Sequence, residues 1–194
     1  TGEVVYQRTL PLSIVPGLYE FAKVNGCGLI TYQGEGVISA FEPDKYVQLE
    51  ARINGIPIKV VDDFVSYVDF DINKCLMTAP EEIAPELEKQ LQEKYSDVAS
   101  IYRSEPYFIE IMPKDVNKAT SLDHMLEGMG LTRENAICCG DGYNDISMIE
   151  YAGTGVAMGN AQPAVKEAAD YITGTNDEDG LVEVIDKFIM KPEA

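Results

Sequence analysis

The sequence predicts an α/β protein made of two parts, and three observations lead to this fold class. From residue 118 onward, short apolar runs alternate with helical segments, which is typical of βαβ units and a parallel sheet. Before residue 113, the pattern helix-strand-strand occurs at both ends of one block, as expected for a compact α+β domain. The chain of 194 residues has room for one large domain or two small ones.

The first block opens with an alternating, β-like segment over residues 1–10 that resembles the second half of a hairpin. Leu12, Val15 and Leu18 then have helical spacing, and Asn25-Gly26 closes that helix. Residues 56–68 are ambiguous between helix and strand. The expected elements are a helix at 11–24, a hairpin of 29–32 and 37–40, a helix at 43–53, a strand at 75–78, a helix at 80–95, and paired strands at 98–102 and 107–112.

The second part follows a linker over residues 113–117. Its first helix has Leu122, Met125 and Leu126 on one face and Gly130 as its C-cap. Strands are then expected at 136–139, 154–158 and 171–173, and helices after residue 145, after residue 163 and over 180–190.

Charge and composition exclude several classes of protein. The formal net charge of −18 argues against nucleic acid or an anionic membrane as a partner. No apolar run is long enough to span a bilayer, and no signal-peptide pattern is present. The four cysteines lack metal-binding spacing, so we expect reduced thiols in a cytoplasmic protein. The single histidine, His124, is expected on the surface, which leaves a histidine-based triad or zinc site with little support.

Residues 136–145 carry the strongest chemical signal. A short apolar run ends in Gly140-Asp141-Gly142, and Asn144 and Asp145 follow before a short helix. Two carboxylates and an amide therefore lie at the end of a buried strand, the edge at which open α/β sheets bind ligands. Such hard oxygen ligands suit Mg²⁺, which completes its coordination shell with waters and substrate phosphate. Taken alone, the same residues would serve equally well as a turn and a helix cap.

Three motifs in order resemble the haloacid-dehalogenase (HAD) superfamily of phosphatases. They are Lys118 at a helix start, the run Gly140-Asp141-Gly142-Tyr143-Asn144-Asp145, and the run Gly155-Val156-Ala157-Met158-Gly159-Asn160-Ala161. Within the superfamily, the chain resembles the Cof-like branch with a type IIB cap, over nearly its whole length. The resemblance implies a partial Rossmann-like core over residues 1–11 and 113–194 and an α+β cap domain over residues 12–112.

The resemblance also implies an activity and the roles of four residues. Such enzymes form an aspartyl-phosphate with Mg²⁺ bound, and water then hydrolyses it. Asp141 would be a metal ligand, and Asp145 would be the supporting carboxylate, acting through a neighbouring group or a water. Asn144 would contact the phosphoryl group, and Lys118 would balance the charge between nucleophile and phosphate. The substrate would be a small phosphorylated metabolite, typically a sugar phosphate.

The residue chemistry agrees with these roles. Phosphoryl transfer depends on positioning and on positive charge around the transferred group. A lysine at a helix start is disfavoured by the helix dipole, which favours a functional reason for Lys118. Ala119 replaces the glycine that is common after this lysine. The Gly159-Asn160 loop either lines the cleft or merely turns the chain toward the next helix.

The nucleophile motif of the family, an apolar strand ending in Asp-x-Asp-Gly, is not present ahead of the cap. Asp69-Phe70-Asp71 has the Asp-x-Asp spacing but lacks the following Gly-Thr turn and lies inside the cap-like block. We therefore expect the chain to be a fragment that begins after the first two motifs and is inactive alone. An exposed edge of the core sheet is then expected to promote self-association.

Three functional hypotheses follow. The first is a phosphatase of small phosphorylated metabolites, represented here by an incomplete piece. The second is a non-catalytic protein, either a pseudo-enzyme or a binding module that uses the cap and half of the cleft. The third is a sugar phosphomutase, which shares the same phosphoryl-transfer chemistry.

Overall fold

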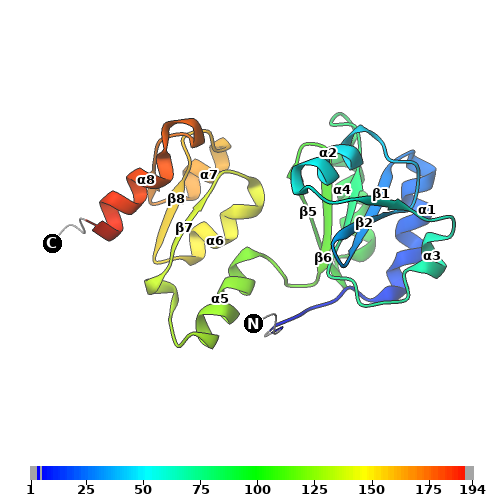
Figure 1. Ribbon diagram of the computed structural model, residues 1–194, viewed down its shortest axis with the longest axis horizontal. Helices are drawn as coiled ribbons and strands as arrows, with labels where there is room; N and C mark the ends of the chain where they lie inside the picture. Colours follow the sequence, from blue (N-terminus) through cyan, green and yellow to red (C-terminus); the bar gives the residue numbers. More distant parts are fainter. Residues whose placement is uncertain (1–3, 5, 191–194) are drawn as a thin grey trace. The chain divides into compact units, whose positions relative to one another are not determined.

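The computed structural model describes residues 4 and 6–190, and the chain divides into two compact units, 1–116 and 117–194 (Figure 1). The first unit is built on a six-stranded sheet of order β3-β2-β1-β4-β6-β5. Only β2 and β3 pair in parallel, and the other neighbours are antiparallel. The strands are β1 (Gly28–Gln33), β2 (Gly36–Ser39), β3 (Ile58–Val60), β4 (Cys75–Thr78), β5 (Ala99–Glu105) and β6 (Phe108–Pro113).

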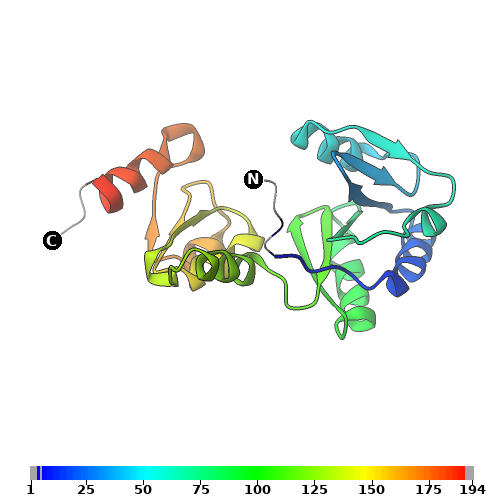
Figure 2. The ribbon, with the colours of Figure 1, turned by 60° about the horizontal axis from the view of Figure 1, so that its bottom comes forward.

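Helices cover both faces of this sheet. They are α1 (Val15–Asn25), α2 (Lys45–Asn54), α3 (Phe64–Tyr67) and α4 (Ala84–Tyr95), and a 3-10 turn (Leu12–Ile14) precedes α1. Leu18, Phe64 and Leu91, from α1, α3 and α4, share one buried core with the sheet, whereas Val47 of α2 belongs to a separate core. Figure 2 accordingly places α1 and α4 on one side of the sheet and α2 on the other.

Local chemistry explains where the helices of this unit begin and end. Gly26 and Gly55 both have φ of 65°, the left-handed conformation that glycine adopts without strain, and they close α1 and α2. Asp44 caps the start of α2, where its Oδ1 accepts hydrogen bonds from the backbone N–H groups of Tyr46 and Val47, both at 2.8 Å.

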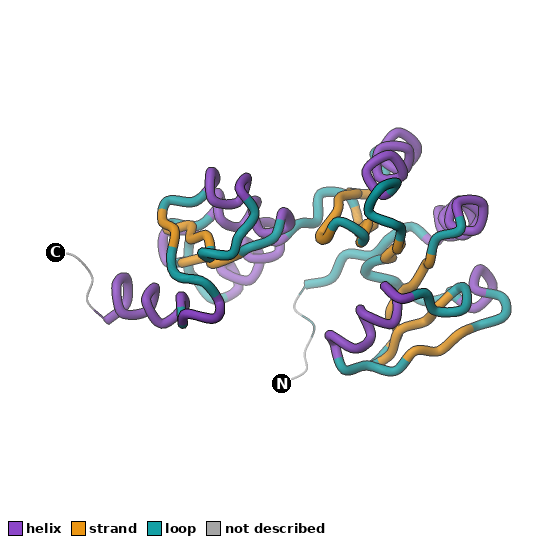
Figure 3. Tube along the Cα trace, turned by 90° about the horizontal axis from the view of Figure 1, so that it is seen from above, coloured by secondary structure: helices purple, strands orange, loops and turns teal. Residues whose placement is uncertain are grey.

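The second unit is a short parallel sheet of order β7-β8-β9 with helices packed beside it (Figure 3). Its core includes Ile149, Ala157 and Val165. The elements are α5 (Lys118–Gly128), β7 (Ile137–Gly140), α6 (Ile146–Tyr151), β8 (Thr154–Ala157), α7 (Pro163–Ala168), β9 (Tyr171–Ile172) and α8 (Gly180–Ile185), which continues as a π-helical segment (Asp186–Met190). Single 3-10 turns lie at Arg133–Asn135, Tyr143–Asp145 and Asn176–Glu178.

The predicted hairpin, the paired strands before the linker and the parallel sheet of the second part are confirmed. The prediction of a β-like segment at residues 1–10 is wrong for the part that the structure describes, because residues 4 and 6–10 form no strand. Alternation favours a strand only when a partner strand is available, and here Leu10 gives its N–H to the carbonyl of Ile72 at 2.8 Å. Residues 1–3 and 5 of that segment lie outside the described residues.

Two smaller expectations are refined. The ambiguous stretch 56–68 divides into β3 and α3. Helix α5 ends at Gly128, and Gly130 adopts its left-handed φ of 69° one residue after the cap. All four cysteines are free thiols in the structure. No helix in the described part of the chain combines the length and apolar character needed to cross a lipid bilayer.

Candidate functional site

The four predicted site residues all belong to the second unit, and three of them are joined by hydrogen bonds. Asp141 follows β7 directly, Asn144 and Asp145 lie in the 3-10 turn that leads into α6, and Lys118 is the first residue of α5. Lys118 Nζ contacts Asp145 Oδ1. Asp145 Oδ2 accepts hydrogen bonds from the backbone N–H groups of Asp141 at 2.9 Å and Gly142 at 3.0 Å.

Asp145 is the centre of this arrangement. It is only 5% exposed, so its carboxylate requires compensation, and it receives three donors. Gly140 makes room for it, because a Cβ at that position would lie 2.4 Å from Asp145 Cβ. The Gly-Asp-Gly sequence therefore does more than turn the chain: it lets the backbone wrap around a buried carboxylate.

The start of α5 fixes Lys118 next to this carboxylate. Asn117 caps the helix, with its Oδ1 accepting from the N–H of Thr120 at 2.9 Å, while its own N–H donates to Thr120 Oγ1 at 3.1 Å. The Lys118 side chain remains 46% exposed, whereas that of Asp145 is 7% exposed. The ammonium thus combines a fixed position with access to solvent, as a group that meets a ligand phosphate requires.

The carboxylate of Asp141 is held from a different direction. Asn160, in the loop after β8, donates from Nδ2 to Asp141 Oδ2 at 3.0 Å. The backbone N–H of Asn176, in the loop after β9, donates to Asn160 Oδ1 at 3.1 Å. Sequence reasoning singled out the Gly159-Asn160 loop but not its partner at Asn176, because a contact through a backbone N–H has no residue-type signature.

The oxygen-bearing side chains of this site fit a magnesium ion that takes its remaining ligands from other groups. No group of three or more His, Cys, Asp or Glu side chains arranged to hold a metal occurs among the described residues. Asp141 is exposed and offers a carboxylate, and Asn144 in the following 3-10 turn is half-buried and offers an amide. Mg²⁺ typically binds through one or two protein carboxylates and otherwise through water and phosphate oxygens.

The alternative nucleophile stretch lies in the other unit and has a different structural context. Asp69 and Asp71 fall in the irregular segment between α3 and β4, and the N–H of Asp69 bonds the carbonyl of Tyr67 at 3.0 Å. The apolar residues before Asp69 form the short helix α3 instead of a buried strand. The strand-end placement that the motif requires is therefore missing there.

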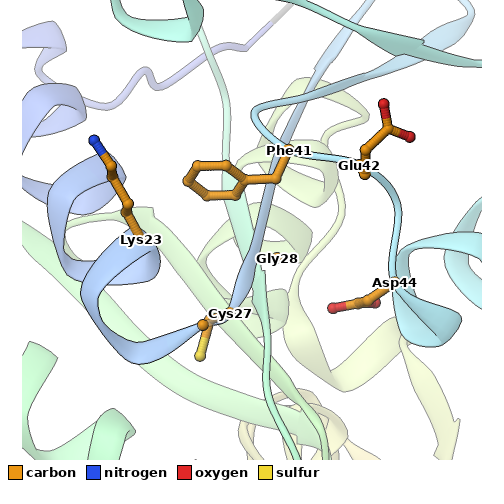
Figure 4. A pocket seen from close by; sticks show the side chains of 7 residues that line it. Lys23, Cys27, Gly28, Phe41, Glu42 and Asp44 are labelled. Atoms are coloured by element: carbon orange, nitrogen blue, oxygen red, sulfur yellow. The ribbon is translucent and has the colours of Figure 1, made fainter.

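Two of the cavities in the first unit border β1. One, of about 460 Å³, adjoins the end of β1 and is lined by residues that include Tyr32, Asp71 and Lys74. The other, of about 270 Å³, is drawn in Figure 4, where Lys23 lies on one side of Phe41 and Glu42 and Asp44 lie on the other.

The thiol that lines this smaller cavity is not poised for catalysis. Burial, reinforced by the nearby Asp44 carboxylate, raises the pKa of Cys27 to about 11. The thiolate, which is the reactive form, is therefore scarce near neutral pH.

Comparison with known proteins adds a family and several relatives. Residues 1–185 match the family model described as haloacid dehalogenase-like hydrolase. The chain is 50% identical over 90 residues to the 5-amino-6-(5-phospho-D-ribitylamino)uracil phosphatase YcsE of Bacillus subtilis, covering 46% of this chain and 36% of YcsE. It is 31% identical over 191 residues to YitU of the same organism, which has the same enzyme name, covering 94% of this chain and 68% of YitU.

Solved structures agree with the fold. A haloacid dehalogenase-like hydrolase from Bacteroides thetaiotaomicron is 45% identical with a TM-score of 0.84, covering 95% of this chain and 69% of that one. The HAD subclass IIB sugar phosphatase BT4131 is 28% identical with a TM-score of 0.81 and the same coverage. The aligned part of this chain thus spans from about a third to about two thirds of the length of these relatives.

Proposed function

Because the chain belongs to the haloacid dehalogenase-like hydrolases, in the branch with a type IIB cap, we propose that it serves the Mg²⁺-dependent hydrolysis of small phosphate monoesters. One observation carries the proposal: the ammonium of Lys118 contacts Asp145, whose other oxygen binds the backbone N–H of Asp141. Asp145 thereby links the Lys118 ammonium to the backbone of the Asp141 turn, at the end of a parallel strand.

Each residue has a proposed task. Lys118 places positive charge where the equatorial oxygens of a phosphoryl group gather negative charge. Asp145, whose two oxygens already meet Lys118 and two backbone N–H groups, orients that lysine and the Asp141 turn and reaches a metal only through a neighbouring group or water. Asp141 would hold Mg²⁺, and Asn144 would donate to the phosphoryl group. Bound Mg²⁺ would neutralise phosphate charge and align the group for in-line attack.

We further propose that the nucleophile, an aspartate that forms the aspartyl-phosphate, lies outside residues 1–194. The Asp69-Phe70-Asp71 segment lacks a strand end, and the chain spans only part of its relatives' length. In this proposal, residues 1–11 and 113–194 belong to the catalytic core and residues 12–112 form the cap. The 194-residue chain would then be inactive alone.

The substrate class is proposed from the relatives. One is named for a substrate with a phosphorylated ribityl chain and another is a sugar phosphatase. Sugar phosphates or similar phosphorylated metabolites are therefore the favoured substrates, in a cytoplasmic setting that suits four free thiols.

The open edge of β7 supports a secondary proposal of self-association. Among the described residues, β7 pairs only with β8. Unpaired strand edges are sites at which other chains add.

The test begins with the nucleotide sequence upstream of Thr1, where we expect an in-frame Asp-x-Asp-Gly segment. The 194-residue chain should not turn over an aryl phosphate with Mg²⁺, whereas the extended chain should. Asp141→Asn and Lys118→Met should each reduce turnover by about a hundredfold or more, because each removes charge stabilisation of the transition state. Asp186→Asn, an exposed carboxylate outside the site, is the matched control and should have no effect.

Three outcomes would contradict parts of the proposal. Turnover by the 194-residue chain that Asp69→Asn abolishes would move the nucleophile to residue 69. An inactive extended chain would favour a pseudo-enzyme or binding module. Transfer of phosphate between sugar positions, with no release of inorganic phosphate, would favour a phosphomutase.

A further inference from the structure

A single side-chain amide joins all three loops that leave the carboxyl ends of the parallel strands. Asn160, after β8, donates to the Asp141 carboxylate after β7 and accepts from the backbone N–H of Asn176 after β9. Only one orientation of the amide satisfies both contacts, because a carboxylate oxygen requires a donor and an N–H requires an acceptor. The N–H of Asn176 therefore fixes which end of Asn160 faces Asp141.

The loop that carries Asn160 is held in place without this side chain. The N–H of Gly159 bonds the carbonyl of Gly174 at 2.9 Å, and Lys166 Nζ donates to the carbonyl of Gly159 at 2.6 Å. A Cβ on Gly159 would lie 2.9 Å from the carbonyl carbon of Gly174, so the two loops approach as closely as glycine permits. Because Asn160 itself is exposed, its side chain is not required for packing.

We propose that Asn160 is a positioning residue that orients the Asp141 carboxylate for a divalent cation. The inference rests on the proposed Mg²⁺ site and deepens it. By engaging Oδ2, the amide fixes the direction in which Oδ1 points, and an exposed aspartate would otherwise lose rotamer freedom when it binds an ion. Hydrogen-bond partners of metal-binding carboxylates typically account for a tenfold to hundredfold difference in affinity.

The experiment uses the 194-residue chain and Mg²⁺ alone, with binding followed by amide NMR signals of residues 140–145. Asn160→Ala should raise the Kd for Mg²⁺ by about tenfold, the lower end of the range for such partners. Its thermal unfolding temperature should stay close to that of the wild type, because backbone contacts hold the loop.

A matched pair of variants at Asn176 tests whether its backbone N–H acts on the metal site through Asn160. Asn176→Ala keeps the backbone N–H and should leave the Kd unchanged. Asn176→Pro removes that N–H and should weaken Mg²⁺ binding, though less than Asn160→Ala does. Proline is compatible with this place, because Asn176 begins a 3-10 turn and Thr175 before it is extended at ψ of 168°. In the metal-free chain, Asn176→Pro should also shift the side-chain NH₂ signals of Asn160.

The outcomes distinguish this inference from the function on which it rests. Wild-type affinity in Asn160→Ala, or equal weakening by Asn176→Ala and Asn176→Pro, would refute the positioning role and leave the metal site intact. A wild-type chain in which Mg²⁺ moves no signal over residues 140–145 would refute the metal site, and the positioning role with it.

Discussion

At the scale of single residues, the second unit is organised around a buried charge. Asp145 is 5% exposed and its three donors come from two elements: the side chain of Lys118 in α5 and two backbone N–H groups that follow β7. An ion pair of this kind stabilises the fold less than its contacts suggest, because the Asp145 carboxylate loses its water on burial. Removing one partner is costly, however, since the remaining charge is left without compensation.

Substitutions at this pair should have unequal effects on stability. Asp145→Asn turns an NH₂ group or a single carbonyl oxygen toward three donors, so it should lower the free energy of unfolding by about 1–3 kcal/mol. Lys118→Met should cost less, because Asp145 keeps two backbone donors and the lysine is half exposed. Urea unfolding followed by circular dichroism measures both.

The exposed pair of Arg133 and Glu134 offers the control. Arg133→Ala should change the free energy of unfolding by less than about 0.5 kcal/mol, as surface ion pairs usually do. Equal losses in Asp145→Asn and Arg133→Ala would contradict the structural importance assigned to Asp145.

The sequence was most informative where side-chain type alone carries meaning. A lysine, two aspartates and an asparagine at motif spacing predicted a cluster, and the structure brings Lys118, Asp141 and Asp145 into one hydrogen-bonded group. The sequence did not predict the contact between Asn160 and the N–H of Asn176, because every residue except proline carries that donor.

At the scale of elements, prediction succeeded where a segment carries its own boundary signals. Helix α1 ends at the glycine that the sequence indicated, and the hairpin of β1 and β2 closes across a glycine-rich turn. The strand prediction for residues 4 and 6–10 was wrong, because strand formation depends on a partner strand, which local alternation does not reveal. Residues 56–68 were ambiguous because β-branched residues there serve a three-residue strand and a single helical turn in succession.

Two glycines in different surroundings, Gly155 and Gly128, should respond to alanine in opposite directions. A Cβ on Gly155, in β8, would lie 2.3 Å from the backbone carbonyl oxygen of Ile149 in α6, so Gly155→Ala must push that helix away and should destabilise the protein strongly. Gly128, in α5, faces open space without a positive φ. Gly128→Ala should therefore stabilise it by about 0.5–1 kcal/mol.

Thermal unfolding of the two alanine variants measures the difference. Similar melting temperatures for Gly155→Ala and Gly128→Ala would mean that the close approach of β8 and α6 does not constrain the second unit.

At the scale of the whole molecule, the two units differ in the chemistry they bury. The first unit has one extensive core, which encloses Cys27 and Cys75, and a small core around Val47, whereas the second unit has a small core around Ile149 and Val165. Burial raises the pKa of Cys75 to about 12, and burial with the Asp44 carboxylate raises that of Cys27 to about 11. Burial and the hydrogen bond to Glu50 also raise the pKa of Tyr32.

These shifts predict that the first unit loses stability in alkali. A thiol whose pKa is raised on folding contributes its full stability below the ordinary value of 9.0, and this contribution is lost as the pH rises toward the folded pKa. Each pKa unit of difference is worth about 1.4 kcal/mol. Unfolding of the first unit should therefore require progressively less urea between pH 9 and about 11.

The measurement is urea unfolding at pH 7.5, 9 and 10.5, in the presence of a non-thiol reductant. Far-ultraviolet circular dichroism is the suitable signal, because the chain has no tryptophan and tyrosine emission changes on ionisation. Lysine deprotonation also makes the chain more negative in this range, so the wild type alone does not identify the cause. The double variant Cys27→Ala/Cys75→Ala should be weaker at pH 7.5 but should lose less stability on going to pH 10.5. An unchanged pH slope in that variant would assign the alkaline loss to general charge repulsion instead of to the two buried thiols.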